Sequence, residues 1–434
     1  MSTESLSASG LYQRLSSPVC GILTKVKETE RQKFFPDLHV YRGTIAAGLD
    51  TSKQDCIRRA DARGPIHVSG VGYDRESALF SLLGEAVERY SAANYGAIPA
   101  FRATVSRLNK PFLHPDDVVG SRDEKIWKGR SLRFHKGLPI AWVQGANLQT
   151  GQDILVPALL ALMTAQTQQP EELFEIPVST GLAAGQNQDL ALKAGLFEVI
   201  ERDAIAIHWL LRRPLHPILN LDAFIDDLPE AAQILLRRHS LLKADAFAMT
   251  NALSLPAVMV RLRALKPGAG FSLGAAVADD WPTAIAKAVR EACHVWLSYV
   301  LSWSPTAPQI SIQDIKTYTD HGAFYFNAAQ PDLTDWLFAG EGVAVLNSDR
   351  KELSLSELII ACQRKQLTVL AVDLTPADIR SLGLSVVRVI VPQLQPLTCG
   401  ASRKFTDMRR MEKCINEADT PLTHGVNENP HPFA

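Results

Sequence analysis

The sequence predicts a mixed α/β protein, with one large domain in which buried, glutamate-bearing helices alternate with several β-strands. Its 434 residues are 46% hydrophobic and 21% charged, which supplies enough apolar side chains for a large core. Short β-like runs alternate with helical segments through most of the chain. Two helical segments about a hundred residues apart share a glutamate pattern and are apolar nearly all round, which is typical of buried helices.

The first half of the chain contains clear local signals. In order, we expect a strand near 38–41, a strand at 66–72 that ends in a glycine turn, a helix at 75–93, and a hairpin of strands 140–143 and 154–156 around the turn 147–151. Residues 164–172 are polar, and we expect a mobile connection there.

The second half continues the alternation. After residues 179–185 comes the second glutamate helix, followed by a helix at 231–239, strands at 257–262 and 272–277, a helix at 282–300, and strands at 343–346, 367–374 and 386–391. From about residue 401 the chain becomes charged and then loses periodicity.

The repeated glutamates predict an acidic site. On a helix, residues three and four apart share a face, so Glu85 and Glu88 project together, and so do Glu198 and Glu201. Buried carboxylates are costly unless they are paired or bound to a cation, and Mg²⁺ prefers oxygen ligands of this kind. The alternative is that each glutamate simply pairs with the arginine four residues later, as on exposed helices. Two copies in apolar surroundings favour the shared site.

Composition and missing motifs exclude several classes. The chain has 45 Lys plus Arg against 46 Asp plus Glu, so its net charge gives no pull toward nucleic acid or an anionic membrane. Residues 1–17 lack the apolar region of a signal peptide, and no apolar run approaches a membrane span. The six cysteines form no CxxC motif, which indicates reduced thiols in a cytoplasmic protein. No GxxxxGK[ST], GxSxG or HExxH motif occurs.

With its two glutamate helices, the chain resembles the YcaO family, in particular the cyclodehydratases that make azoles in ribosomal peptides. Four places carry the resemblance: the SxxxExxER helix from Ser81 to Arg89, the segment 179–185 that leads into ExxERDA at 198–204, the helical AVREA around Glu291, and residues 386–400. They follow one another in the family's order between about residues 65 and 400.

The resemblance implies that ATP and Mg²⁺ are held between these helices. The metal ligands it implies are Glu85, Glu88, Glu198 and Glu201, with Asp189 as a further candidate; near the nucleotide it places Ser81, Arg89, Arg202, Lys287 and Glu291. It also implies the reaction. A Cys, Ser or Thr side chain of a peptide attacks the preceding amide carbonyl, ATP phosphorylates the oxyanion, and phosphate leaves to give a thiazoline or oxazoline. Metal ions neutralise the charge on the transferring phosphoryl group.

Three positions depart from the family's pattern. Members often have an acidic residue eight positions before the second-helix glutamate, where this chain has Leu190 with Asp189 beside it. Lys287 stands where members often have Arg, and it can contact a phosphate only as a point charge. Azoline-forming members often end in a Pro-x-Pro-x-Pro tail that reaches the active site. This chain has Pro430, Pro432 and then Ala434, so we expect a functional tail, the alternative being a disordered end.

The resemblance also suggests how the chain is organised. We expect an N-terminal region packed on the core at 1–60, the ATP-binding catalytic domain at 61–400, and a C-terminal segment with the proline tail at 401–434. The expected partners are a ribosomal precursor peptide and a separate E1-like protein that binds its leader, with a flavin dehydrogenase as a possible further member of the complex. Thioamide or macroamidine formation by the same phosphorylation chemistry, or a scaffold role without turnover, are the alternatives.

Five other residues have plainer interpretations. We expect His208 and Trp209 to be core residues and Cys399 to be structural. His294 either faces the site or is a hydrogen-bonded helix histidine. Arg388 alternates with valines on a strand, so it is either a solvated charge or a phosphate contact.

Overall fold

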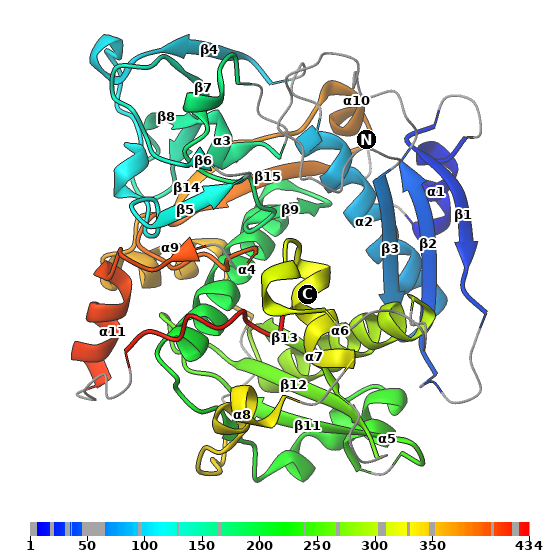
Figure 1. The fold of residues 1–434 in the computed structure, drawn as a ribbon. Helices are drawn as coiled ribbons and strands as arrows, with labels where there is room; N and C mark the ends of the chain where they lie inside the picture. Colours follow the sequence, from blue (N-terminus) through cyan, green and yellow to red (C-terminus); the bar gives the residue numbers. More distant parts are fainter. Residues whose placement is uncertain are drawn as a thin grey trace.

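The computed structural model describes residues 7–17, 21–30, 35, 37–45, 66–93, 98–127, 130–163, 167–237, 239–265, 270–302, 310–327, 330–346, 352–400, 403–418 and 425–433. Within them, three sheets surround a long central helix, α4 (Gln188–Leu210) (Figure 1).

The N-terminal layer is a three-stranded antiparallel sheet in the order β1 (Leu23–Glu28), β2 (His39–Ile45) and β3 (Ile66–Gly72). Helix α2 (Arg75–Ala93) packs on β3, and α1 (Ala8–Leu15) packs on α2. The contact between α2 and β3 is close, because a Cβ on Gly70 would lie 2.1 Å from the backbone N of Leu82. The glycines of β3 therefore let the first glutamate helix lie directly on the strand.

The second sheet covers one side of α4. Its order is β4 (Ala100–Ala103), β7 (Ile140–Asn147), β14 (Leu370–Asp373), β15 (Ser385–Ile390) and β9 (Leu182–Gly185), with β8 (Asp153–Pro157) paired to β7. Helix α4 packs on β9 and β15, and α2 also contacts β9. Both glutamate helices therefore meet at this edge of the sheet.

The third sheet lies on the other side of α4 (Figure 1). It contains β10 (His216–Pro217), β11 (Leu242–Ala248), β12 (Ala257–Ala264) and β13 (Phe271–Val277), and α6 (Trp281–Ser302) packs on β12 and β13. A further small sheet consists of β16 (Arg403–Lys404), β5 (Glu124–Trp127) and β6 (Arg130–Ser131).

The remaining helices are short. They are α3 (Ala158–Ala161), α5 (Glu230–Arg237), α7 (Tyr318–Asn327), α8 (Pro331–Thr334), α9 (Leu355–Arg364), α10 (Ala377–Ser381) and α11 (Arg409–Ala418). The 3₁₀ turns are η2 (Val105–Arg107), η3 (Pro115–Asp117), η4 (Pro170–Glu172), η5 (Leu221–Ala223), η6 (Ile225–Asp227), η7 (Ile312–Asp314) and η8 (Asp335–Phe338). No described helix is both long and apolar enough to cross a membrane.

The mixed α/β prediction is confirmed, and α2 and β3 have the predicted bounds. Two local predictions are wrong. Residues 343–346 form no strand, since only Val343 pairs, in an isolated bridge with Ile218. Residues 170–172 form η4, and Glu172 is 2% exposed and paired with Arg102, so this end of the polar connection is anchored by a buried ion pair. Residues 164–166 lie outside the described residues.

Candidate active site

Three of the predicted glutamates are fixed by backbone amides of the neighbouring strands. Ser69 of β3 donates its N–H to Glu85 Oε2 at 2.9 Å, and Ala184 of β9 donates to Glu88 Oε1 at 3.1 Å. Glu198 Oε2 accepts from the N–H of Gly181 at 3.0 Å. Each bond orients one carboxylate against a strand end, which a flexible exposed glutamate would not achieve.

Helix α6 also carries a glutamate that is held by a strand amide. Glu291 of α6 accepts the N–H of Ala275 in β13 at 2.7 Å through Oε2. Its other oxygen, Oε1, lies 3.9 Å from Nη2 of Arg202 on α4. Helices α2, α4 and α6 therefore each present a carboxylate that is anchored on a strand.

Arg202 is the cation that these carboxylates share. Its Nε lies 3.6 Å from Glu201 Oε1 and 3.8 Å from Glu198 Oε1. Burial acts to lower the pKa of Arg202, but the surrounding carboxylates of Glu201, Glu198 and Glu291 raise it further, so the net shift is upward. Arg89 has a similar place on α2, with its Nε 3.6 Å from Glu85 Oε1.

The arginines do not neutralise the whole cluster. Burial, the largest cause, raises the pKa of Glu88 to about 8; Arg89 opposes this, and the charges of Glu198 and Glu85 add to it. Burial likewise raises the pKa of Glu201 to about 8, with Glu291 and Glu198 reinforcing the shift. A bound cation would offset the cost of ionising these carboxylates in a buried site.

Lys287 adds a second kind of basic group. It lies one helical turn before Glu291 on α6. Burial, followed by the charge of Arg290, lowers the pKa of Lys287, while Glu201 raises it. Ser81 is half-buried on α2, one turn before Glu85. Both are placed as the sequence predicts, on the helices that carry the carboxylates.

The arrangement suits a metal–nucleotide complex better than a bare metal ion. Among the described residues, no three His, Cys, Asp or Glu side chains converge closely enough to hold an ion by themselves. Mg²⁺ usually takes one or two carboxylates and completes its shell with phosphate oxygens and water. Anchored carboxylates flanked by Arg and Lys fit that division of ligands.

Asp189 is not brought into the cluster. It is exposed in the first turn of α4. Nine residues separate it from Glu198, which corresponds to roughly 13 Å along the axis and about half a turn around it. Leu190 is 46% exposed.

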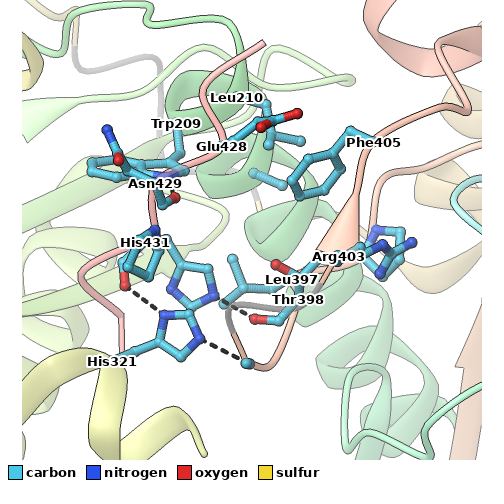
Figure 2. A pocket seen from close by; sticks show the side chains of 14 residues that line it. Trp209, Leu210, His321, Leu397, Thr398, Arg403, Phe405, Glu428, Asn429 and His431 are labelled. Atoms are coloured by element: carbon cyan, nitrogen blue, oxygen red, sulfur yellow. Dashed lines mark hydrogen bonds between the residues drawn. The ribbon is translucent and has the colours of Figure 1, made fainter. Parts of the chain in front are cut away.

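The proline tail is docked, and Asn429 and His431 lie beside Trp209 and His321 (Figure 2). Asn427 donates its N–H to the carbonyl of Leu210, the last residue of α4, at 2.8 Å. Trp209 Nε1 donates to the carbonyl of Asn429 at 2.8 Å, and the hydroxyl of Tyr325 on α7 donates to that of Pro430 at 2.6 Å. Residues 430–433 are buried, and Phe433 belongs to the core around α4. Ala434 lies outside the described residues.

Two stacked histidines clip the tail to the turn at 398–400 (Figure 2). The rings of His321 and His431 lie 4.1 Å apart at an interplanar angle of 13°. Gly400 donates its N–H to His321 Nε2 at 3.0 Å, so the ring proton is on Nδ1, which donates to the carbonyl of His431 at 2.9 Å. His431 Nε2 donates to the carbonyl of Thr398 at 2.6 Å. We call these two residues the histidine clip.

The clip is neutral and lies within electrostatic reach of the acidic cluster. Burial lowers the pKa of His321 to about 4. The pKa of His431 is lowered well below its usual value by burial first, with the charges of His321 and Arg202 contributing. The tail therefore lies near the arginine that the glutamates share.

Arg388 corrects both interpretations offered by the sequence. It is 2% exposed, and it donates to the carbonyls of Ala161 at 3.0 Å, Thr180 at 2.6 Å and Val178 at 2.7 Å. Burial lowers its pKa to about 10. Arg388 thus fixes the segment that ends at Gly181, the donor to Glu198. A strand pattern cannot reveal this, because all three acceptors are backbone carbonyls far away in the sequence.

The other single residues are resolved as follows. His294 is a hydrogen-bonded helix histidine, 2.9 Å from Ser69 Oγ, and it links α6 to β3. His208 and Trp209 are core residues as predicted. Cys399 contacts the carbonyl of Lys316 at 3.5 Å in its turn. Asp203 forms a buried two-pronged pair with Arg410 and accepts the N–H of Gln395, which ties α4 to α11.

An acidic site on three helices, in a sequence without a common phosphate loop, fits a class of enzymes that bind ATP and Mg²⁺, and comparisons with known proteins identify the family. A family model described as a YcaO cyclodehydratase that binds ATP and Mg²⁺ matches residues 69–395. The chain therefore belongs to the YcaO family. An uncharacterized protein of Methanothermobacter thermautotrophicus is 26% identical over 368 residues, 80% of this chain and 86% of that protein. An uncharacterized protein from the tfuA 3′ region of Rhizobium leguminosarum bv. trifolii is 29% identical over 32% of this chain and 31% of its own.

Solved structures share the fold. A heterocyclase in complex with substrate and cofactor aligns over 98% of this chain with a TM-score of 0.75 and 21% identity, and this chain spans 57% of its length. The YcaO protein of Methanopyrus kandleri bound with AMPPCP and Mg²⁺ aligns over 89% of this chain and 88% of its own, at 17% identity and a TM-score of 0.59. The E. coli microcin synthetase McbBCD complex aligns over 96% of this chain and 99% of its own, at 14% identity and a TM-score of 0.60.

Proposed function

We propose that this chain is an ATP-dependent cyclodehydratase, which converts Cys, Ser or Thr residues of a ribosomal precursor peptide into thiazolines or oxazolines. One observation carries the proposal: carboxylates of α2, α4 and α6 are each anchored on a backbone amide and lie against Arg89 of α2 or Arg202 of α4, forming one acidic site. The family model supports it by its description of ATP and Mg²⁺ binding.

The proposed ligand sets follow from this geometry. Glu85, Glu88, Glu198 and Glu201 would hold Mg²⁺, while Ser81, Arg89, Arg202, Lys287 and Glu291 would lie against the nucleotide. Bound Mg·ATP supplies the phosphoryl group that turns an amide oxygen into a leaving group. The chain's own contribution is electrostatic: Arg202 and Lys287 hold positive charge where the phosphoryl oxygens would lie.

The cyclising nucleophile belongs to the substrate in this proposal. This agrees with the absence from the sequence of the GxSxG and HExxH motifs. The proposed function of the tail is to orient groups of the active site. The residues that would do this are Pro430, Pro432 and Ala434, at the end of the chain that the histidine clip holds in place. The docked tail supports cyclisation over thioamide or macroamidine formation, because azoline-forming members of the family often end in such a tail.

Partners are part of the proposal. The substrate is a ribosomal precursor peptide, and a separate E1-like protein would bind its leader. A flavin dehydrogenase in the same complex could then oxidise azolines to azoles. The assembly of the E. coli microcin synthetase McbBCD complex is a precedent for a multi-protein arrangement in a protein of this fold.

The experiment that tests the proposal combines ring formation with ATP turnover. The chain, an E1-like partner and a Cys-containing precursor are incubated with Mg·ATP, and mass spectrometry follows the loss of one water per ring while phosphate is measured. Glu88→Gln and Glu201→Gln should abolish both signals because each removes a ligand charge and keeps the shape. Glu76→Gln is the matched control, since Glu76 is exposed on the same helix as Glu88. Wild-type turnover by either site variant would contradict the metal assignment.

A further inference from the structure

A large cavity lies beside the acidic site. Its volume is about 500 Å³, well above a packing void and within the range of ligand pockets. Strands β5 and β15, the segment 313–317 and the turn 394–400 surround it. The side chains that keep apolar surface in its wall are Ile126, Leu160, Ile176, Val178 and Ile390.

Most charged groups in this wall are already paired, and Lys316, which also lines it, is exposed. Lys125 forms an ion pair with Glu175, and Arg403 is paired with Asp123 at 2.7 Å. Arg388 donates hydrogen bonds to three backbone carbonyls. A polyanion such as a nucleotide would have to break these contacts, so the interior suits a neutral, apolar occupant.

The cavity is joined to the acidic site through its own wall. Thr180 and Val199 line it, and the residues next to them, Gly181 and Glu198, are hydrogen-bonded to one another. Arg388 also lines it, and the pKa of its guanidinium responds to the charges of Glu198 and Glu88. An occupant of the cavity would therefore contact residues that are adjacent in sequence to Gly181 and Glu198.

The cavity also shares a wall with the docked tail. Thr398 and Gly400 line it, and both hold the histidine clip through their backbone groups. The tail thus fixes the turn that closes this side of the cavity.

We propose that this cavity binds an apolar side chain of the peptide substrate that neighbours the residue to be cyclised. Large neutral residues such as Phe, Leu or Ile fit its chemistry, and the site would select for them. The inference rests on the proposed function, because it takes the occupant from the substrate of the acidic site. Transfer of one such side chain from water favours binding by roughly 10- to 100-fold.

The test compares two capped peptides, acetyl-Phe-Cys-Gly-amide and acetyl-Gly-Cys-Gly-amide, binding to the full chain with Mg·ATP by isothermal titration calorimetry. We expect the Phe peptide to bind at least 10-fold more tightly. Ile176→Trp and Val178→Phe fill the cavity from two different positions and should each remove this preference while ATP affinity is kept. Ile234→Trp is the matched control, because Ile234 is 43% exposed on α5 and does not line the cavity.

Several results would overturn the inference. These are equal affinity for the two peptides, no detectable binding of the Phe peptide at millimolar concentration, or a preference that survives in a folded filling variant. Binding of decanoate but not of the Phe peptide would identify a lipid site instead. If one filling variant fails to fold, the other decides the result.

The outcome is separable from that of the proposed function. A Phe preference in binding without any ring formation would support the cavity site and refute the cyclodehydratase. Ring formation that is indifferent to the neighbouring residue would do the reverse.

Discussion

Gly181 donates its backbone N–H to the carboxylate of Glu198 from a left-handed conformation with φ of +79°. A Cβ at this position would lie 2.1 Å from the carbonyl oxygen of Val389 and 2.9 Å from a methyl group of Val199. Only glycine therefore lets the strand end approach α4 closely enough to anchor a site carboxylate.

Gly181→Ala should be clearly more destabilising than an ordinary glycine substitution. It combines left-handed strain with a collision against backbone, and we expect a loss of about 2–4 kcal/mol in the free energy of unfolding. Gly151→Ala is the control, because Gly151 also has positive φ, at +68°, but a Cβ there meets nothing within 4 Å. Urea unfolding measures both, and equal losses would show that the close approach is unimportant.

The contribution of Glu88 and Glu201 to the stability of the ligand-free protein should fall as pH rises from about 4.5 to about 8. Burial and neighbouring carboxylates raise the folded pKa of both Glu88 and Glu201 to about 8, above the ordinary value of 4.5. The folded state therefore binds more protons than the unfolded chain in this window and loses that advantage as they dissociate. In Glu88→Gln, the decrease in the free energy of unfolding between pH 4.5 and 8 should be smaller by on the order of 1 kcal/mol. Urea unfolding with EDTA present measures this decrease. An unchanged slope would mean that Glu88 is ionised in the folded state.

The histidine clip should keep the tail in place above about pH 6.5 and release it in acid. The pKa of His321 is lowered to about 4, chiefly by burial, so the neutral ring favours folding and this contribution is lost as pH falls from 6.5 toward 4. The hydrogen-exchange protection factors of residues 425–433, corrected for the intrinsic rate at each pH, should fall over that range.

Substitution within the clip should have the same effect at neutral pH. His431→Ala should loosen the tail and lower ring formation while nucleotide affinity is retained. His431→Gln should restore part of both, since its amide can donate to the carbonyl of Thr398 as Nε2 does. A tail that exchanges slowly in His431→Ala would show that Trp209 and Tyr325 suffice to hold it.

The partner proposal predicts a rate difference. The chain alone should modify a full-length precursor slowly or not at all, and an E1-like leader-binding protein should restore the rate. Mass spectrometry of the precursor over time measures both conditions. Efficient, leader-dependent modification by the chain alone would contradict the proposal.

The sequence predicted the parts of this molecule that depend on local pattern. The bounds of α2 and the shared face of Glu85 and Glu88 follow from helical periodicity and apolar context. The bonds from Ser69, Ala184 and Gly181 could not be predicted, because each joins a side chain to a backbone amide of a different element. The resemblance predicted a functional tail, but its partners could not be predicted, because the carbonyls of Asn429 and Pro430 accept hydrogen bonds from side chains of distant elements. The exposed position of Asp189 depends on where α4 begins, which is the least certain feature of a helix read from sequence.

The central claim is that the chain transfers phosphate to the amide oxygen that is lost on ring closure. A precursor peptide carrying ¹⁸O in the carbonyl before its cyclised Cys tests this directly, with the released phosphate analysed by mass spectrometry. The account predicts that each ring formed yields one phosphate that carries the label. Ring formation that leaves the phosphate unlabelled and the label in water would contradict it.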